Sequence, residues 1–176
     1  VLPALFVTAM LACGAGTGLT DVLMNARVTT LEARHDRYLM NLCHAAYSFG
    51  YAAGAVATGL MRAEGWPPAW VMGAMALAAC AFALLTWESD GTIEGLVRPE
   101  GSARAGLGLV PVFGGTIVLI AFLTENAAEN WSALHIEQTL GGSAAQGAMG
   151  PATLALTMGM ARLAGQGLIA RVSPLR

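Results

Sequence analysis

One uncharged stretch constrains the fold of this chain more than any other feature. It runs from Leu107 to Thr124, about eighteen residues, and continues without a helix breaker into Glu125 and Glu129. At about 1.5 Å per residue, a helix of this length approaches the roughly 30 Å hydrocarbon core of a bilayer. The sequence therefore predicts a membrane-spanning helix with two carboxylates on one face near its end. Such carboxylates are either solvated groups at the rim or part of a polar path through the protein.

The composition is also typical of a membrane protein. Hydrophobic residues make up 56% of the 176 residues and charged residues only 11%, whereas a soluble chain carries about 25% charged residues. The formal net charge of −2 gives no basic excess, so we expect no nucleic-acid partner. The three cysteines lie in apolar runs without CxxC or Cys/His spacing. We interpret them as packing residues and expect neither a metal site nor a cofactor.

Apolar segments separated by polar turns predict five membrane-spanning helices. They cover about residues 2–25, 38–61, 69–87, 107–134 and 144–170. The predicted fold class is an all-α, polytopic helical membrane protein. Because the chain begins at Val1 without Met and ends soon after an apolar segment, we expect a piece of a longer protein.

The longest polar stretch, residues 88–106, is Gly-rich and contains Pro99, and we interpret it as a linker between two helix bundles. Arginines gather in alternate connectors. They lie at or near residues 29–37, in the linker and in the C-terminal tail, at Arg27, Arg34, Arg37, Arg98, Arg104, Arg171 and Arg176. The positive-inside rule then places these three regions in the cytoplasm, and the turn at Trp66 and the loop at Gly141 outside.

Polar residues inside two predicted spans are candidates for a solute or ion pathway. Asp21 and Asn25 lie one turn apart near the end of the first span, where a carboxylate facing lipid would cost about 2.5–3.5 kcal/mol. On the second span a stripe repeats every three to four residues. It comprises Asn41, His44, Ser48, Tyr51, Ala55 and Thr58. We interpret the stripe as the lining of a cavity, in which His44 is either a structural hydrogen-bonding group or a proton carrier.

The end of the fifth predicted span, Ala161 to Arg171, reads ARLAGQGLIAR. It resembles the loop motif that follows the second and eighth helices in the major facilitator superfamily. Arg162, Gly165, Gln166 and Arg171 are the motif positions, although the family usually has Asp where Gln166 stands. In the family, the motif normally makes a charge relay between this Asp and Arg. The chain lacks the acid of that relay, although Arg162 and Arg171 remain. The runs GAGTGLTDVLMNARVTTLEAR and ENAAENWSAL are similar to the bacterial sugar-permease-like group, which includes fucose permease relatives and the bypass-of-stop-codon proteins.

Members of this superfamily have two bundles of six helices joined by a long cytoplasmic loop, and the resemblance implies that the chain covers about the fourth to eighth helices. Residues 1–87 would be the last three helices of the N-terminal bundle. Residues 88–106 would be the cytoplasmic inter-bundle linker, and residues 107–176 the first two helices of the C-terminal bundle. The chain would then need its missing helices as partners.

The resemblance further implies secondary active transport of a small sugar-like or drug-like solute across the bacterial inner membrane by alternating access. Its candidate pathway residues are Asp21, Asn25, Asn41, His44, Ser48, Tyr51, Glu125, Glu129, Asn130 and Trp131. From their depth along the spans, Asp21 is expected toward the cytoplasm and Glu125 toward the outside, in opposite vestibules. Trp131 is either an aromatic platform for the solute or an anchor at the membrane interface.

Glu125 is the candidate for coupling to protons, because a carboxylate shielded from water takes up a proton more readily, especially beside a second acid such as Glu129. The rim interpretation of both acids stays open. An enzyme is not expected, because the sequence contains no nucleophile motif or cluster of metal ligands. The alternative is a permease subunit of an ATP-driven transporter or a non-transporting scaffold, although the Gly-rich linker offers no convincing helix to engage an ATPase.

Overall fold

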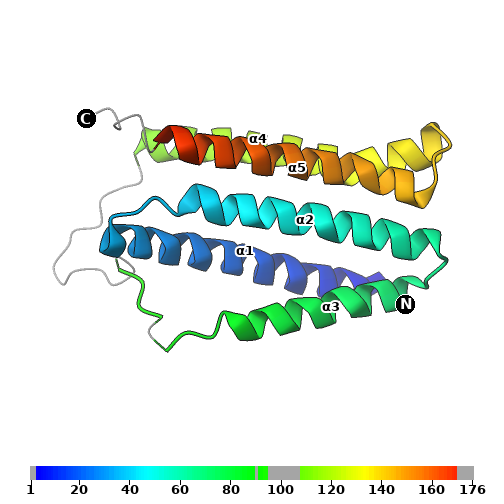
Figure 1. The fold of residues 1–176 in the computed structure, drawn as a ribbon, viewed down its shortest axis with the longest axis horizontal. Helices are drawn as coiled ribbons and strands as arrows, with labels where there is room; N and C mark the ends of the chain where they lie inside the picture. The colour runs from blue at the N-terminus through cyan, green and yellow to red at the C-terminus, as the bar shows by residue number, and fades with distance from the viewer. Residues whose placement is uncertain (1–2, 90, 95–107, 170–176) are drawn as a thin grey trace. The chain divides into compact units, whose positions relative to one another are not determined.

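The computed structural model describes residues 3–89, 91–94 and 108–169. Its elements, in order, are α1 (Pro3–His35), α2 (Met40–Ala63), α3 (Pro68–Leu85), α4 (Leu109–Leu134), the π-helix η1 (His135–Thr139) and α5 (Ala144–Ile169). Every regular element in the described ranges is helical (Figure 1), which confirms the predicted all-α class. The bounds of α2, α3 and α5 agree with the predicted spans to within about two residues. Most of the predicted linker, residues 95–107, lies outside the described residues.

Helix α1 is longer than its apolar part, because the segment 29–37, expected as a connector, is helical as far as His35. The residues Leu-Glu-Ala-Arg in this segment favour helix. The helix ends where Asp36 adopts a left-handed conformation with φ of 50°. Glu32 then links α1 to the next helix, because its Oε1 accepts hydrogen bonds from the backbone N–H groups of Leu39, at 2.5 Å, and Met40, at 2.7 Å. The carboxylate thus satisfies amide groups at the start of α2.

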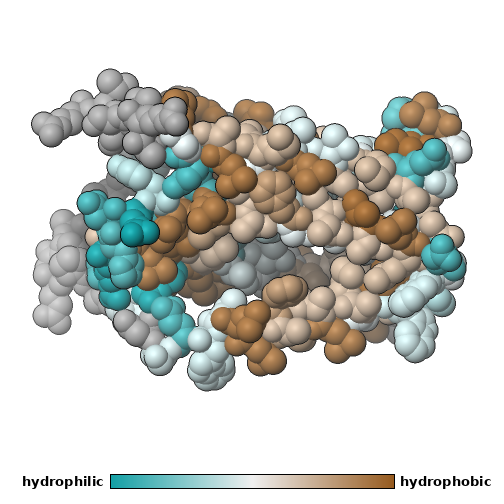
Figure 2. Space-filling model, viewed as in Figure 1, coloured by the Kyte–Doolittle hydropathy of each residue, from teal (hydrophilic) through white to brown (hydrophobic). Residues whose placement is uncertain are grey.

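Three helical segments are long and apolar enough to cross a membrane: α1, α3, and α4 together with η1. Helices α2 and α5 have 24 and 26 residues, enough to span about 30 Å of hydrocarbon, but polar residues and glycines interrupt them. Large apolar side chains on the helices are exposed, among them Leu77 (74%), Leu84 (76%) and Ile117 (68%). Figure 2 shows apolar residues along the helices and hydrophilic residues gathered near helix ends. Lipid is the solvent that suits this distribution.

The chain divides into two compact units. In the first, Glu88, Thr92 and Glu94 contact the C-terminal half of α1. Arg27 forms an ion pair with Glu88 and donates to the carbonyl oxygen of Thr92 at 2.5 Å, and Arg34 Nε lies 2.9 Å from Glu94 Oε1. The beginning of the predicted linker is therefore held by the arginines of α1. The predicted division into two bundles at residues 88–106 stays a prediction.

The second unit contains α2, α3, α4, η1 and α5. Helices α4 and α5 contact each other along an antiparallel hairpin (Figure 1), whose turn ends in a capping box. There the backbone N–H of Ser143 donates to Gln146 Oε1 at 2.8 Å, and that of Gln146 donates to Ser143 Oγ at 3.3 Å. At Gly150 an added Cβ would lie 2.7 Å from Ser132 Oγ, so only glycine allows α5 to come this close to α4.

Small residues also form the contact between α2 and α5. Ala45 and Ala52 of α2, and Ala148, Ala152 and Ala155 of α5, are buried. At Gly59 a Cβ would overlap with the Cβ of Ala148. Such an interface lets two helix backbones approach closely, which is how helices commonly associate in membranes. It also fixes which face of α2 is turned toward the interior of the unit.

Candidate functional site

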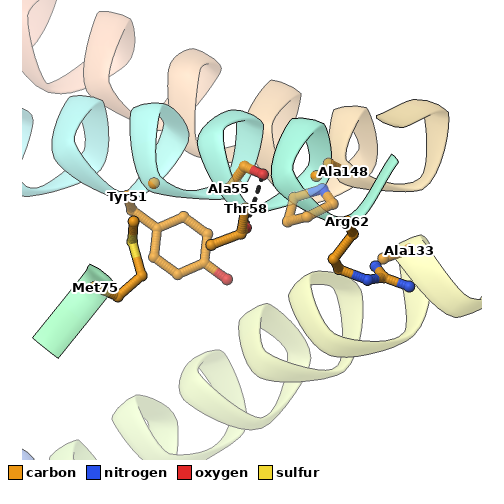
Figure 3. Close-up of a pocket in the computed structure, with 10 residues that line it drawn as sticks. Tyr51, Ala55, Thr58, Arg62, Met75, Ala133 and Ala148 are labelled. Atoms are coloured by element: carbon orange, nitrogen blue, oxygen red, sulfur yellow. Dashed lines mark hydrogen bonds between the residues drawn. The ribbon is translucent and has the colours of Figure 1, made fainter. Parts of the chain in front are cut away.

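A pocket of about 350 Å³ lies along one face of α2 (Figure 3). Helix α2 provides most of its wall, and α3, α4 and α5 complete it. The lining residues are Tyr51, Gly54, Ala55, Thr58, Gly59, Arg62, Met75, Ala133, Ala148 and Pro151. Their spacing on α2 follows the helical repeat of the predicted polar stripe, which therefore faces a cavity over its second half. The volume is at the lower end of the roughly 300–1,000 Å³ typical of small-molecule sites.

The pocket has few polar groups, each on α2. In Figure 3 the ring of Tyr51 extends from α2 into the space beside Met75 of α3. Thr58 Oγ1 donates a hydrogen bond to the backbone carbonyl of Ala55 at 3.0 Å, so its hydroxyl oxygen can still accept one from a ligand. The remaining wall is mostly Ala, Gly, Pro and Met. This combination of an apolar surface and a small number of hydrogen-bonding groups is common in ligand pockets.

An ion pair lies at one end of the pocket. Arg62, in the last turn of α2, donates from Nη1 to Glu137 Oε1 at 2.9 Å and from Nη2 to Glu137 Oε2 at 2.8 Å. Glu137 belongs to η1, so this bidentate contact joins the end of α2 to the end of the α4 segment. The turn after α2 and the loop before α5 therefore lie at the same end of the unit, in agreement with the predicted alternation.

Glu125 and Glu129 lie on the side of α4 that faces the other helices of the unit. Both are half-buried, and the partly buried positions Ser132 and Ala133 continue the same face. This confirms that the two acids share a face. Both carboxylates lie in the neighbourhood of the Tyr51 hydroxyl. They lie beside the pocket without lining it.

The first half of the α2 stripe meets the loop-motif residues of α5. Arg162 Nη1 donates to the carbonyl oxygen of His44 at 3.1 Å and also to Ser48 Oγ. Ser48 is buried. A Cβ on Gly165 would lie 3.8 Å from Asn41 Nδ2, so the motif packs against the start of α2. The structure thus brings His44 and Ser48 together with Arg162, and Asn41 close to Gly165. None of these residues lines the pocket, and among the predicted pathway residues Tyr51 is the one that does.

The other candidates lie elsewhere. On α1, in the first unit, Asn25 Nδ2 donates to Asp21 Oδ1 at 3.2 Å. On α4, Asn130 donates to the carbonyl of Asn126 at 2.8 Å, and Trp131 is exposed. An exposed Trp131 near a helix end agrees better with the anchor interpretation than with a platform in the pocket. Gln166 is half-buried in α5, and Arg171 lies outside the described residues.

The sequence patterns did not identify the partners Arg62 and Glu137. They are 75 positions apart in the chain, so spacing alone could not associate them. One signal was available, however. Among the connectors predicted to lie outside, Arg62 is the only basic residue, and Glu137 lies next to the other outer loop. Opposite charges at the same predicted depth are candidates for an ion pair.

The apolar helices and the pocket between them define a multi-pass helical membrane protein. The chain is 28% identical over 171 residues to a protein of Yersinia pestis named as an uncharacterized MFS-type transporter, covering 95% of this chain and 43% of the relative. It is 29% identical over 177 residues to an uncharacterized transporter of Sinorhizobium fredii, covering 95% of this chain and 45% of that relative. The chain thus spans less than half the length of these curated relatives.

These similarities confirm the resemblance to the major facilitator superfamily, which is the family in the first relative's name. Neither name tests the narrower sugar-permease-like group. No protein-family model matches the chain, and no solved structure matches it significantly.

Proposed function

We propose that this chain is part of a secondary transporter that carries a small solute across a membrane by alternating access. The observation that carries the proposal is the pocket along α2, which combines Tyr51 and Thr58 with an apolar wall inside a group of lipid-exposed helices. A solute that crosses a bilayer needs such a protected polar surface. The transporter names of both relatives support the same class and fit a protein that is not an enzyme.

For the solute we propose a sugar-like or small drug-like molecule. The pocket volume of about 350 Å³ suits a solute of that size, and Tyr51 and Thr58 offer hydrogen bonds to hydroxyl or carbonyl groups. The charge of Arg62 is balanced by Glu137, so the pocket wall favours a neutral solute over an anion. We place the protein in the bacterial inner membrane.

Coupling to protons is the second part of the proposal. Glu125 and Glu129 are half-buried on the inner face of α4, in the neighbourhood of Tyr51, which lines the pocket. A carboxylate in such a place can bind a proton in one conformation and release it in another. Their position next to the solute pocket connects proton binding to the state of the α2 wall.

Uptake by the full-length protein in proteoliposomes tests this function. Labelled neutral sugars and small amphipathic drugs are screened with an imposed proton gradient, with and without a protonophore. We expect accumulation of at least one solute that collapses when the gradient is removed. Uptake that requires ATP and a separate ATPase would contradict the proposal and favour a permease subunit. Absence of uptake for all solutes in a folded protein would favour a scaffold.

A further inference from the structure

The Arg62–Glu137 ion pair lies at the end of the α2 pocket. Arg62 lines the pocket, and its side chain is still 49% exposed, whereas the side chain of Glu137 is only 19% exposed. The less exposed carboxylate therefore holds the more exposed arginine side chain at the end of the cavity. The bidentate geometry uses both terminal nitrogens of the guanidinium, so Arg62 is fixed in orientation as well as in place.

The site of Glu137 is built by two further features. First, Glu137 lies in a π-helix, a rare conformation that occurs frequently at functional positions. Second, Gly147 of α5 leaves the room that the Glu137 side chain occupies. A Cβ at Gly147 would lie 2.6 Å from Glu137 Cγ and 2.9 Å from its Cδ, and closer still to Oε1. Any other residue at position 147 would displace the carboxylate.

We infer that the Arg62–Glu137 ion pair closes one end of the α2 pocket and must break for a solute to enter or leave by that end. The pair joins α2, through Arg62, to η1, through Glu137, and Gly147 of α5 packs against the Glu137 side chain. Separating the end of α2 from the α4–α5 hairpin would break both hydrogen bonds at once. The interaction is strong enough to favour the closed state and weak enough to be opened by a modest change in helix packing.

The inference rests on the proposed function for the identity of what passes, but its test needs no transport. In a full-length protein without other cysteines, Ala55→Cys places a thiol in the pocket wall. Its labelling rate by a membrane-impermeant maleimide is measured from each side of the membrane. Replacing Glu137 by Gln should raise the rate from one side by up to about fivefold, because a pair this exposed to solvent contributes at most about 1 kcal/mol to the closed state.

Three variants serve as comparisons. Glu88→Gln breaks the Arg27–Glu88 pair, neither member of which lines the pocket, and should leave the labelling rate unchanged. Gly147→Ala keeps both charges but displaces the carboxylate, and should raise the rate by a smaller factor. The exchange of charges in the double variant Arg62→Glu with Glu137→Arg should bring the rate back toward that of the unmodified pair.

Equal labelling rates in the Glu137→Gln, Gly147→Ala and parent proteins would overturn the inference. So would an equal increase with Glu88→Gln, which would indicate general loosening. If Glu137→Gln fails to give a folded protein, the comparison of Gly147→Ala with the double variant decides the matter. A protein that transports nothing but shows the expected labelling pattern would contradict the proposed function alone.

Discussion

At the scale of single residues, Arg162 is the polar contact between α2 and α5 with the clearest consequence for stability. Its guanidinium donates to the carbonyl oxygen of His44 and to the buried Ser48 hydroxyl, both of which are neutral. Arg162 is partly buried, so these hydrogen bonds offset part of the cost of removing its charge from water. The motif residue Arg162 thus holds the first half of the α2 stripe, at His44 and Ser48, against α5.

Replacing Arg162 by Gln should therefore lower the free energy of unfolding by about 1–3 kcal/mol, since it removes charge-assisted hydrogen bonds between α5 and α2. The His44 carbonyl keeps the hydrogen bond that Ser48 Oγ donates to it at 3.0 Å. Thermal unfolding of the full-length protein in detergent measures the effect. Ser48→Ala, which removes one acceptor and keeps the other, should cost less. A variant Arg162→Gln as stable as the parent protein would mean that the contact contributes nothing.

A substitution at Glu125 distinguishes an acid on the transport pathway from a solvated acid at the membrane rim. Replacing Glu125 by Gln removes the proton-binding group and keeps the shape of the side chain, so accumulation driven by a proton gradient should be lost while solute exchange at equal pH continues. Glu129→Gln, one turn further along the same face of α4, provides the comparison. Full uphill uptake by both variants would show that neither acid couples transport to protons.

At the scale of the elements, close contact between α2 and α5 depends on small residues. Gly59 lies against Ala148, where an additional methyl group has no space, whereas Gly54 on the same helix has nothing within 4 Å of an added Cβ. The two positions therefore separate the effect of helix propensity from that of packing. Alanine favours helix over glycine by about 1 kcal/mol at both, but only at position 59 does it force the helices apart.

Gly59→Ala should accordingly destabilise the protein by about 1–3 kcal/mol through overpacking, while Gly54→Ala should be neutral or slightly stabilising. Unfolding of the two full-length variants in the same detergent gives the comparison. Equal stability of the pair would contradict the tight α2–α5 interface.

At the scale of the whole molecule, the sequence predicts the elements better than their contacts. Apolar runs and turns are local signals, so the all-α class, the order of the helices and the shared face of Glu125 and Glu129 could be predicted. Helix propensity carried α1 past its apolar part, which hydropathy alone does not report. The first half of the α2 stripe contacts Arg162 and the second half lines the pocket. The hydrogen bond between Arg162 and His44 joins residues 118 positions apart, and no local sequence pattern predicts it.

The central claim is that the α2 pocket lies on the path of the solute. Filling the pocket with Ala55→Trp, compared with Ala53→Trp on the exposed side of the same helix, tests it most directly. The measurement is the initial rate of solute exchange by the full-length protein in proteoliposomes. We predict that Ala55→Trp reduces exchange at least about tenfold, because an indole fills most of a small cavity, while Ala53→Trp retains it. Equal exchange by both folded variants would contradict the account.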